Sequence, residues 1–225
     1  MKNSAAAVTA VADLDEITGV TSFTVTDADG SATNSAEAVS LTFSDVAETT
    51  ANAITVDASV ITDSNDDVTV NAGDNDESAT TFTITGGAGA DILTGGAGID
   101  TITGGAGIDT IDGEEGADII DGGAGNDILT GGTGNDTITG GAGNDIISDG
   151  TGNDIVDGGA GNDIITIGGG TDSITGGLGD DTFKIADTAD IAATETLAGG
   201  DGTDTLWITG AGTDALDASF TKATS

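Results

Sequence analysis

Hydrophobic positions recur every nine residues in the central part of the chain, from Gly86 to Lys184. The eighth position of each nine-residue unit is aliphatic or aromatic: Leu93, Ile102, Ile111, Ile120, Leu129, Ile138, Ile147, Val156, Ile165, Ile174 and Phe183. Positions one, two and four are mostly glycine, which tolerates positive φ and close backbone approach, so the first half of each unit predicts a tight turn. The second half is β-branched and alternating, and it predicts a very short strand.

Two such units make one coil of a solenoid. A strand, a turn, a strand and a turn together take eighteen residues, so turns two units apart stack on the same side. The eighth-position side chains then point inward from two strands as two facing ladders. Residues 86–184 are therefore predicted to form an all-β, parallel solenoid.

The flanking regions extend this pattern less regularly. Residues 1–85 lack the nine-residue unit but alternate as strands do, for example at Val39, Leu41 and Phe43. Ile84 precedes Leu93 by nine residues, so the aliphatic ladder begins before the glycine-rich turns. This favours a β-rich N-terminal region that continues the solenoid, and a separate β-sandwich is the alternative.

Residues 185–225 begin with an acidic insertion rich in alanine and threonine, from Ile185 to Ala198. The nine-residue unit then returns in degenerate form at Gly199–Trp207 and more weakly at Gly210–Leu216. The roll is predicted to resume or to be capped in this segment. Phe183 and Trp207 are predicted to fill and close the ends of the core, because the ends of a solenoid must be covered.

The sixth position of every unit is aspartate, and stacking brings these carboxylates together. Strands that lie about 4.8 Å apart place Asp91 beside Asp109. Two carboxylates at that spacing repel by roughly 3 kcal/mol at an effective dielectric of ~20, and nine such pairs exceed the ~5 to 15 kcal/mol of an ordinary domain's stability. A hard cation between successive turns would reverse this effect. Oxygen ligands in flexible, glycine-rich loops suit Ca²⁺ better than Mg²⁺.

The composition excludes several classes of function. Forty acidic residues against three lysines give a formal net charge of −37, which excludes nucleic acid as a partner. Histidine and cysteine are absent, so the chain has no imidazole or thiol chemistry and no disulfide, and we expect no enzyme activity. No apolar stretch is long enough to span a bilayer.

The unit Gly86-Gly87-Ala88-Gly89-Ala90-Asp91-Ile92-Leu93-Thr94 and its successors resemble the RTX nonapeptide repeat, over residues 86–184. The resemblance implies a right-handed parallel β-roll that holds up to about nine Ca²⁺ ions in its turns. It implies side-chain ligands at Asp91, Asp100, Asp109, Asp118, Asp127, Asp136, Asp145, Asp154, Asp163, Asp172, Asp181 and Asp204. It also implies turn carbonyl ligands from Gly86, Ala88, Gly95, Ala97, Gly104, Ala106, Gly122, Ala124, Gly131, Thr133, Gly140, Ala142, Gly158, Ala160 and Gly176. Departures from the pattern at Glu114, Glu115, Asp149 and Ile167 put the sites in those turns in doubt.

These observations favour a secreted, calcium-binding structural protein of the bacterial cell surface, of the S-layer type. The resemblance implies export by type I secretion, with folding and assembly on Ca²⁺ outside the cell, and the expected partners are a second copy of the chain or a cell-surface polysaccharide. An adhesin stalk or extender is the alternative. A folding or secretion domain of a larger exported enzyme or toxin is less favoured. An ice-binding roll is also less favoured, because the third positions Ala97, Glu115, Thr133, Thr151 and Gly169 break the ladder it would need.

Overall fold

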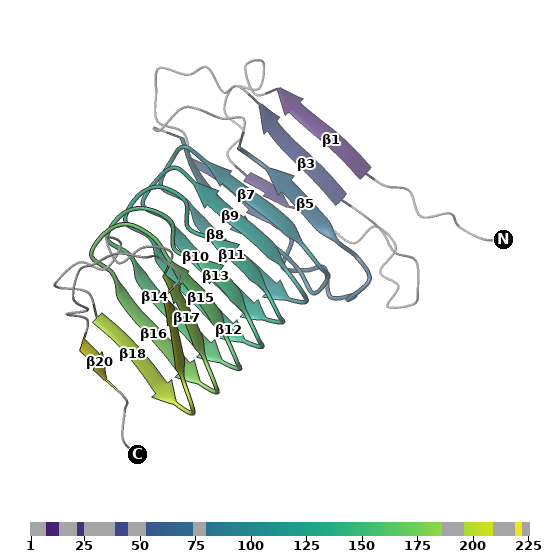
Figure 1. Ribbon diagram of the computed structural model, residues 1–225. Coiled ribbons are helices and arrows are strands. Elements are labelled where there is room, and N and C mark those ends of the chain that lie inside the picture. The colour runs from purple at the N-terminus through teal and green to yellow at the C-terminus, as the bar shows by residue number, and fades with distance from the viewer. Residues whose placement is uncertain are drawn as a thin grey trace.

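A computed structural model describes residues 8–13, 22–24, 39–44, 53–73, 80–185, 196–208 and 219–221. Their strands form two parallel sheets of ten strands each, and consecutive strands alternate between the sheets (Figure 1). The odd sheet contains β1 (Val8–Asp13), β3 (Val39–Ser44), β5 (Val68–Asn71), β7 (Ile92–Gly96), β9 (Thr110–Glu114), β11 (Ile128–Thr130), β13 (Ile146–Ser148), β15 (Ile164–Ile167), β17 (Thr182–Ile185) and β19 (Thr205–Ile208). The even sheet contains β2 (Ser22–Thr24), β4 (Ala53–Asp57), β6 (Thr81–Thr85), β8 (Thr101–Ala106), β10 (Ile119–Ala124), β12 (Thr137–Ala142), β14 (Ile155–Ala160), β16 (Ser173–Leu178), β18 (Thr196–Asp201) and β20 (Ser219–Thr221).

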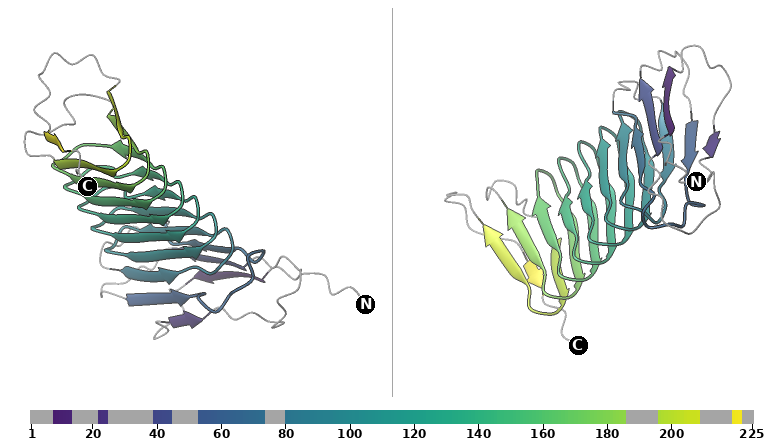
Figure 2. Two further views of the ribbon diagram at one scale, coloured as in Figure 1. Left: turned by 90° about the horizontal axis from the view of Figure 1, so that it is seen from below. Right: turned by 90° about the vertical axis from the view of Figure 1, so that its right-hand side faces the viewer.

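The two sheets face each other as the walls of an elongated roll (Figure 2). Within the repeats each strand pairs with the strand two units further on, as Ile120 does with Ile138. This confirms the predicted coil of two units. None of the described residues belongs to a helix that could cross a membrane.

The core is the pair of facing ladders. The eighth-position side chains from Leu93 to Phe183 are all buried, with exposed fractions of 0 to 1%. The seventh position points the other way, because successive side chains of a strand alternate between its faces, and Ile92 is 52% exposed. The sequence pattern correctly assigned the inward position in every unit.

Strands before the repeats pair into the same two sheets. Ile84 on β6 is fully buried and pairs with Ile102 on β8, and β5 pairs with β7. The rings of Phe43 and Phe82 pack 5.5 Å apart between the walls. These coils take more residues per turn than the repeats do, since Val68 and Asp91 are in contact across 23 positions.

The C-terminal segment adds further strands to both sheets. β18 pairs with β16, and β19 pairs with β17. The second degenerate tract, Gly210–Leu216, lies outside the described residues, as does most of the acidic insertion.

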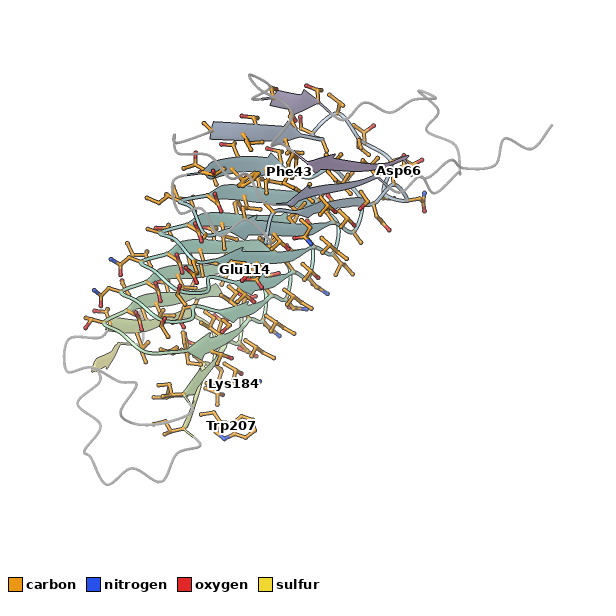
Figure 3. The ribbon with its side chains drawn as sticks, turned by 90° about the horizontal axis from the view of Figure 1, so that it is seen from above. Phe43, Asp66, Glu114, Lys184 and Trp207 are labelled. Carbon is orange, nitrogen blue, oxygen red and sulfur yellow. The ribbon has the colours of Figure 1, made fainter. Side chains whose placement is uncertain are left out.

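Phe183 is buried as predicted, but the prediction for Trp207 is wrong. Trp207 is 55% exposed and lies beside Lys184 at the C-terminal end of the odd sheet (Figure 3). The reason is its register: Leu206 takes the inward eighth position, so Trp207 falls on the outward ninth.

Glycines at the second position of most units adopt positive φ, for example 105° at Gly132 and 106° at Gly141. Glu114 stands at this position in the fourth unit with a φ of 72°. It is the one non-glycine residue among those described whose φ is positive, and a side chain in this region costs about 1 to 2 kcal/mol.

Replacing Glu114 with glycine should therefore stabilise the calcium-loaded protein by about 1 kcal/mol, because the gain from the relieved backbone exceeds the entropy cost of glycine. Glu114→Gln is the matched control, since it removes the charge and keeps the strain. Urea unfolding at fixed calcium measures both variants. Equal stabilisation by both would show that charge and not backbone strain is the cause.

Candidate metal centre

The eleven sixth-position aspartates line the turns in two stacks, and every one of them is buried, with an exposed fraction of 0 to 2%. The glycine-rich half of each unit folds back tightly enough to enclose the carboxylate that follows it. Each stack contains one aspartate from every coil of eighteen residues, as the sequence predicted.

One oxygen of each carboxylate joins a ladder along the stack. The backbone N–H of Asp91 donates to Oδ1 of Asp109 at 2.8 Å, and the N–H of Asp109 donates to Oδ1 of Asp127 at 2.8 Å. The same bond links Asp100 to Asp118 on the other stack. These bonds fix the orientation of each carboxylate and leave its second oxygen facing the turn.

The second oxygen, Oδ2, is buried and has no hydrogen-bond partner along most of both stacks. This holds for Asp100, Asp109, Asp118, Asp127, Asp136, Asp145, Asp154, Asp163 and Asp181. At the N-terminal end, Oδ2 of Asp91 accepts a 2.7 Å bond from the Gly87 N–H. A buried charged oxygen without a partner is costly, so a repeated set of them indicates a missing counter-charge.

Most of these unpartnered oxygens share a small space with a backbone carbonyl. A Cβ added at Gly122 would lie 2.8 Å from Oδ2 of Asp127 and 2.6 Å from the carbonyl oxygen of Gly140, on the next coil. The first-position glycine thus keeps open the space that both oxygens face. The same convergence occurs at Gly86, Gly95, Gly104, Gly113, Gly131, Gly140, Gly158 and Gly176.

This donor set fits Ca²⁺. It is made only of oxygen, it combines a carboxylate with a carbonyl, and it lies in a glycine-rich loop, as calcium sites do. The aspartate carboxylate and the first-position carbonyl of the next coil would hold the ion. The positive charge of the ion would offset the charge of the buried carboxylates on the two coils.

The predicted carbonyls divide into two groups. The first-position carbonyls of Gly104, Gly122, Gly131, Gly140, Gly158 and Gly176 face an aspartate Oδ2 in this way. Those of Gly113, Asp149 and Gly199 do so as well, although they were not among the predicted ligands. The carbonyls of Gly113 and Asp149 were missed because their units contain other side chains where the pattern has glycine or a small residue. A carbonyl ligand belongs to the backbone, so these side chains do not remove it.

The third-position carbonyls make backbone hydrogen bonds. Ala124, Thr133, Ala142 and Ala160 each accept a 2.8 Å bond from a glycine N–H of the preceding coil. A carbonyl oxygen has two lone pairs, so this bond does not remove it as a ligand. The roles of these carbonyls, and of Gly86, Gly95, Ala88, Ala97 and Ala106, stay predictions.

Asp204 continues the odd stack beyond the insertion. The Asp181 N–H donates to its Oδ1 at 3.1 Å, and its Oδ2 faces Gly199. Its carboxylate is less buried than those of the repeats. The degenerate unit therefore retains the arrangement of the regular one.

Burial raises the pKa of most of the sixth-position aspartates in the repeats. It raises the pKa of Asp109 and Asp118 to about 7, with smaller contributions from neighbouring carboxylates, and backbone N–H donors lower it in part. The pKa of Asp100 rises to about 6 for the same first reason. The spacing of the aspartates predicted mutual repulsion as the cost of the ladder, whereas desolvation is the larger cause.

The raised pKa values predict how the protein responds to pH when calcium is absent. A folded-state pKa above the unfolded value of about 3.9 means that the fold binds protons. The stability of the calcium-free roll is therefore greatest in acid and is lost as the pH rises through about 6 to 7. Calcium-depleted protein should gain β-structure when the pH falls from 8 to 5, as circular dichroism would show.

Calcium-loaded protein is the control for this titration and should respond in the opposite direction, because Ca²⁺ binds only ionised carboxylates. A calcium-free protein that loses β-structure on acidification would contradict the assignment of raised pKa values.

Residues 83–102, 94–129, 130–165 and 149–183 match the family model of the RTX calcium-binding nonapeptide repeat, in four copies. No curated protein matches the chain.

Proposed function

Because the chain is a calcium-binding RTX repeat protein, we propose that it is a structural protein of the bacterial cell surface whose roll folds and assembles on Ca²⁺ outside the cell. The observation that carries this proposal is the stack of buried carboxylates with unpartnered Oδ2 atoms. Such a stack makes the fold conditional on cations. RTX repeats are typical of extracellular proteins exported by type I secretion, and a chain that stays unfolded in calcium-poor cytosol suits that route.

The outer face of the odd sheet supports self-association into a surface layer. Ile128 pairs with Ile146, which pairs with Ile164, so three isoleucines form a row on adjacent strands. Ile128 is 45% exposed and Ile146 is 48% exposed. The high net charge keeps single chains apart. Calcium bound in the turns would reduce that charge, and the folding that it drives would bring the isoleucines into a row.

Electron microscopy of the purified protein with and without Ca²⁺ tests this proposal, and ordered sheets only with Ca²⁺ are the expected result. The double variant Ile128→Thr and Ile146→Thr is the matched test of the row, because Thr110 already takes this position on the neighbouring strand β9. It should fold and bind calcium but lose the sheets. Folded monomers of the wild-type protein at every calcium concentration would contradict the layer.

The elongated shape of the roll (Figure 2) favours one alternative, a rigid stalk or extender of an adhesin. Calcium removal from cells that carry the protein distinguishes the two. Shedding of an ordered lattice supports the layer, and loss of attachment without a lattice supports the stalk. We assign no catalysis to this chain, since it has neither histidine nor cysteine and its buried aspartates are explained as calcium ligands.

A further inference from the structure

Two turns on the even side have a residue other than glycine at the first position, Asp149 in the eighth unit and Ile167 in the tenth, and only Asp149 brings a carboxylate there. Asp149 takes the place of the first-position glycine of the eighth unit. Its side chain is fully buried, with an exposed fraction of 0%. The Gly168 N–H donates to Oδ1 at 2.7 Å, and Oδ2 has no hydrogen-bond partner.

The Asp149 carboxylate converges with two carboxylates of the regular ladder. One oxygen from each of Asp149, Asp154 and Asp172 lies within 4.8 Å of the others. Asp154 is 1% exposed and its Oδ2 is also unpartnered, while Asp172 is 2% exposed. No other three acidic side chains meet in this way in the described part of the chain.

No basic side chain can neutralise this cluster from within the described residues. Lys184, their one lysine, lies at the outward ninth position beside Trp207. The chain has no arginine, so its positive charge comes from three lysines alone. A cation bound by the three oxygens would supply the missing counter-charge.

We propose that Asp149, Asp154 and Asp172 form a three-carboxylate Ca²⁺ site that retains its ion more tightly than the repeating sites do. A regular turn has two ladder carboxylates on adjacent coils, as Asp109 and Asp127 are, and Asp154 and Asp172 are such a pair. Asp149 adds a third carboxylate to this pair. Calcium affinity in proteins rises with the number of charged ligands, over several orders of magnitude.

Asp149 also takes part in the preceding site of the same stack. Its backbone carbonyl faces Oδ2 of Asp136 above Gly131, as a first-position glycine carbonyl would. Its carboxylate serves the site of its own turn. The residue thus keeps the backbone ligand of the repeat and adds a side-chain ligand, which a glycine cannot do.

The test is calcium retention by the full chain over a series of chelator-buffered free calcium concentrations. Bound calcium per chain is measured by atomic emission, and folding is measured on the same samples by circular dichroism. Asp149→Gly restores the regular repeat and so keeps the fold, and Asp149→Asn keeps the shape and removes the charge. Asp157→Asn is the control, because it removes an exposed carboxylate from the same unit.

All four proteins should bind the same amount of calcium at saturation, since the carboxylates of Asp154 and Asp172 remain after either change at Asp149. As the free calcium concentration is lowered, both Asp149 variants should release one ion early, while wild type and Asp157→Asn still hold it. Wild type should release this ion only at a free calcium concentration about tenfold lower. Identical retention by wild type and both Asp149 variants would overturn the site.

The inference rests on calcium binding by the repeats and not on the surface role. Its failure is therefore distinct from a failure of the proposed function. If only the tightly held ion is missing while the ladder still loads and folds, the three-carboxylate site alone is wrong. If no calcium binds at all, calcium-dependent folding is wrong as well.

Discussion

Removal of calcium at pH 8 should abolish most of the β-structure of this protein, and millimolar Ca²⁺ should restore it. The eleven ladder aspartates are buried with exposed fractions of 0 to 2%, and most carry an oxygen without a partner. An unpaired buried charge costs several kcal/mol even after relaxation, and a ladder of them exceeds the ~5 to 15 kcal/mol that stabilises an ordinary domain. Hydrophobic burial cannot offset this, because each repeat contributes one core side chain.

Far-UV circular dichroism in excess chelator, followed by titration with CaCl₂, measures this effect. MgCl₂ at the same ionic strength is the control, since screening by salt acts on both but Mg²⁺ demands a tighter octahedral shell and keeps its waters. Mg²⁺ should restore much less structure than Ca²⁺. Full β-structure in chelator at pH 8 would mean that the carboxylates are accommodated without a cation.

Gly134→Ala should destabilise the calcium-loaded protein by at least about 3 kcal/mol, because it combines backbone strain with a steric overlap. Gly134 is the fourth residue of its unit and has a φ of 139°. An added Cβ would overlap the carbonyl oxygen of Gly116 on the preceding coil. Relief would require two stacked coils to separate, which would break the hydrogen bonds between their turns.

Gly169→Ala is the matched control for this substitution. Gly169 lies at the third position of its unit, where an added Cβ would meet nothing within 4 Å. Alanine occupies this position in most other units. We expect a change within about 0.5 kcal/mol. Urea unfolding at fixed calcium compares the two variants, and similar losses from both would contradict the close stacking of the turns.

The repeating part of the fold follows from the sequence because one period encodes both the coil and its core. Ile102, Ile120 and Ile138 recur every eighteen residues and pair in register on adjacent strands. The aspartate stacks follow from the same spacing. The longer coils before Leu93 have no period, so their pairing could not be calculated from spacing alone.

The remaining features depend on tertiary details. The register of Trp207 is set by Leu206 beside it, and a single position separates the core from solvent. The burial of Asp109 arises from the neighbouring coils, which a local sequence pattern does not reveal. The sequence therefore indicated repulsion between carboxylates but not the desolvation that is the largest cause of the raised pKa of Asp109. Asp149 was visible in the sequence as an irregularity, but only the fold shows that it meets Asp154 and Asp172.

A crystal structure grown in CaCl₂, with an anomalous difference map, tests the central claim most directly. The account predicts calcium peaks in the turns, each bound by an aspartate Oδ2 and by the first-position carbonyl of the next coil, as at Asp127 and Gly140. It also predicts a peak among Asp149, Asp154 and Asp172. A folded roll with no calcium at these oxygens would contradict it.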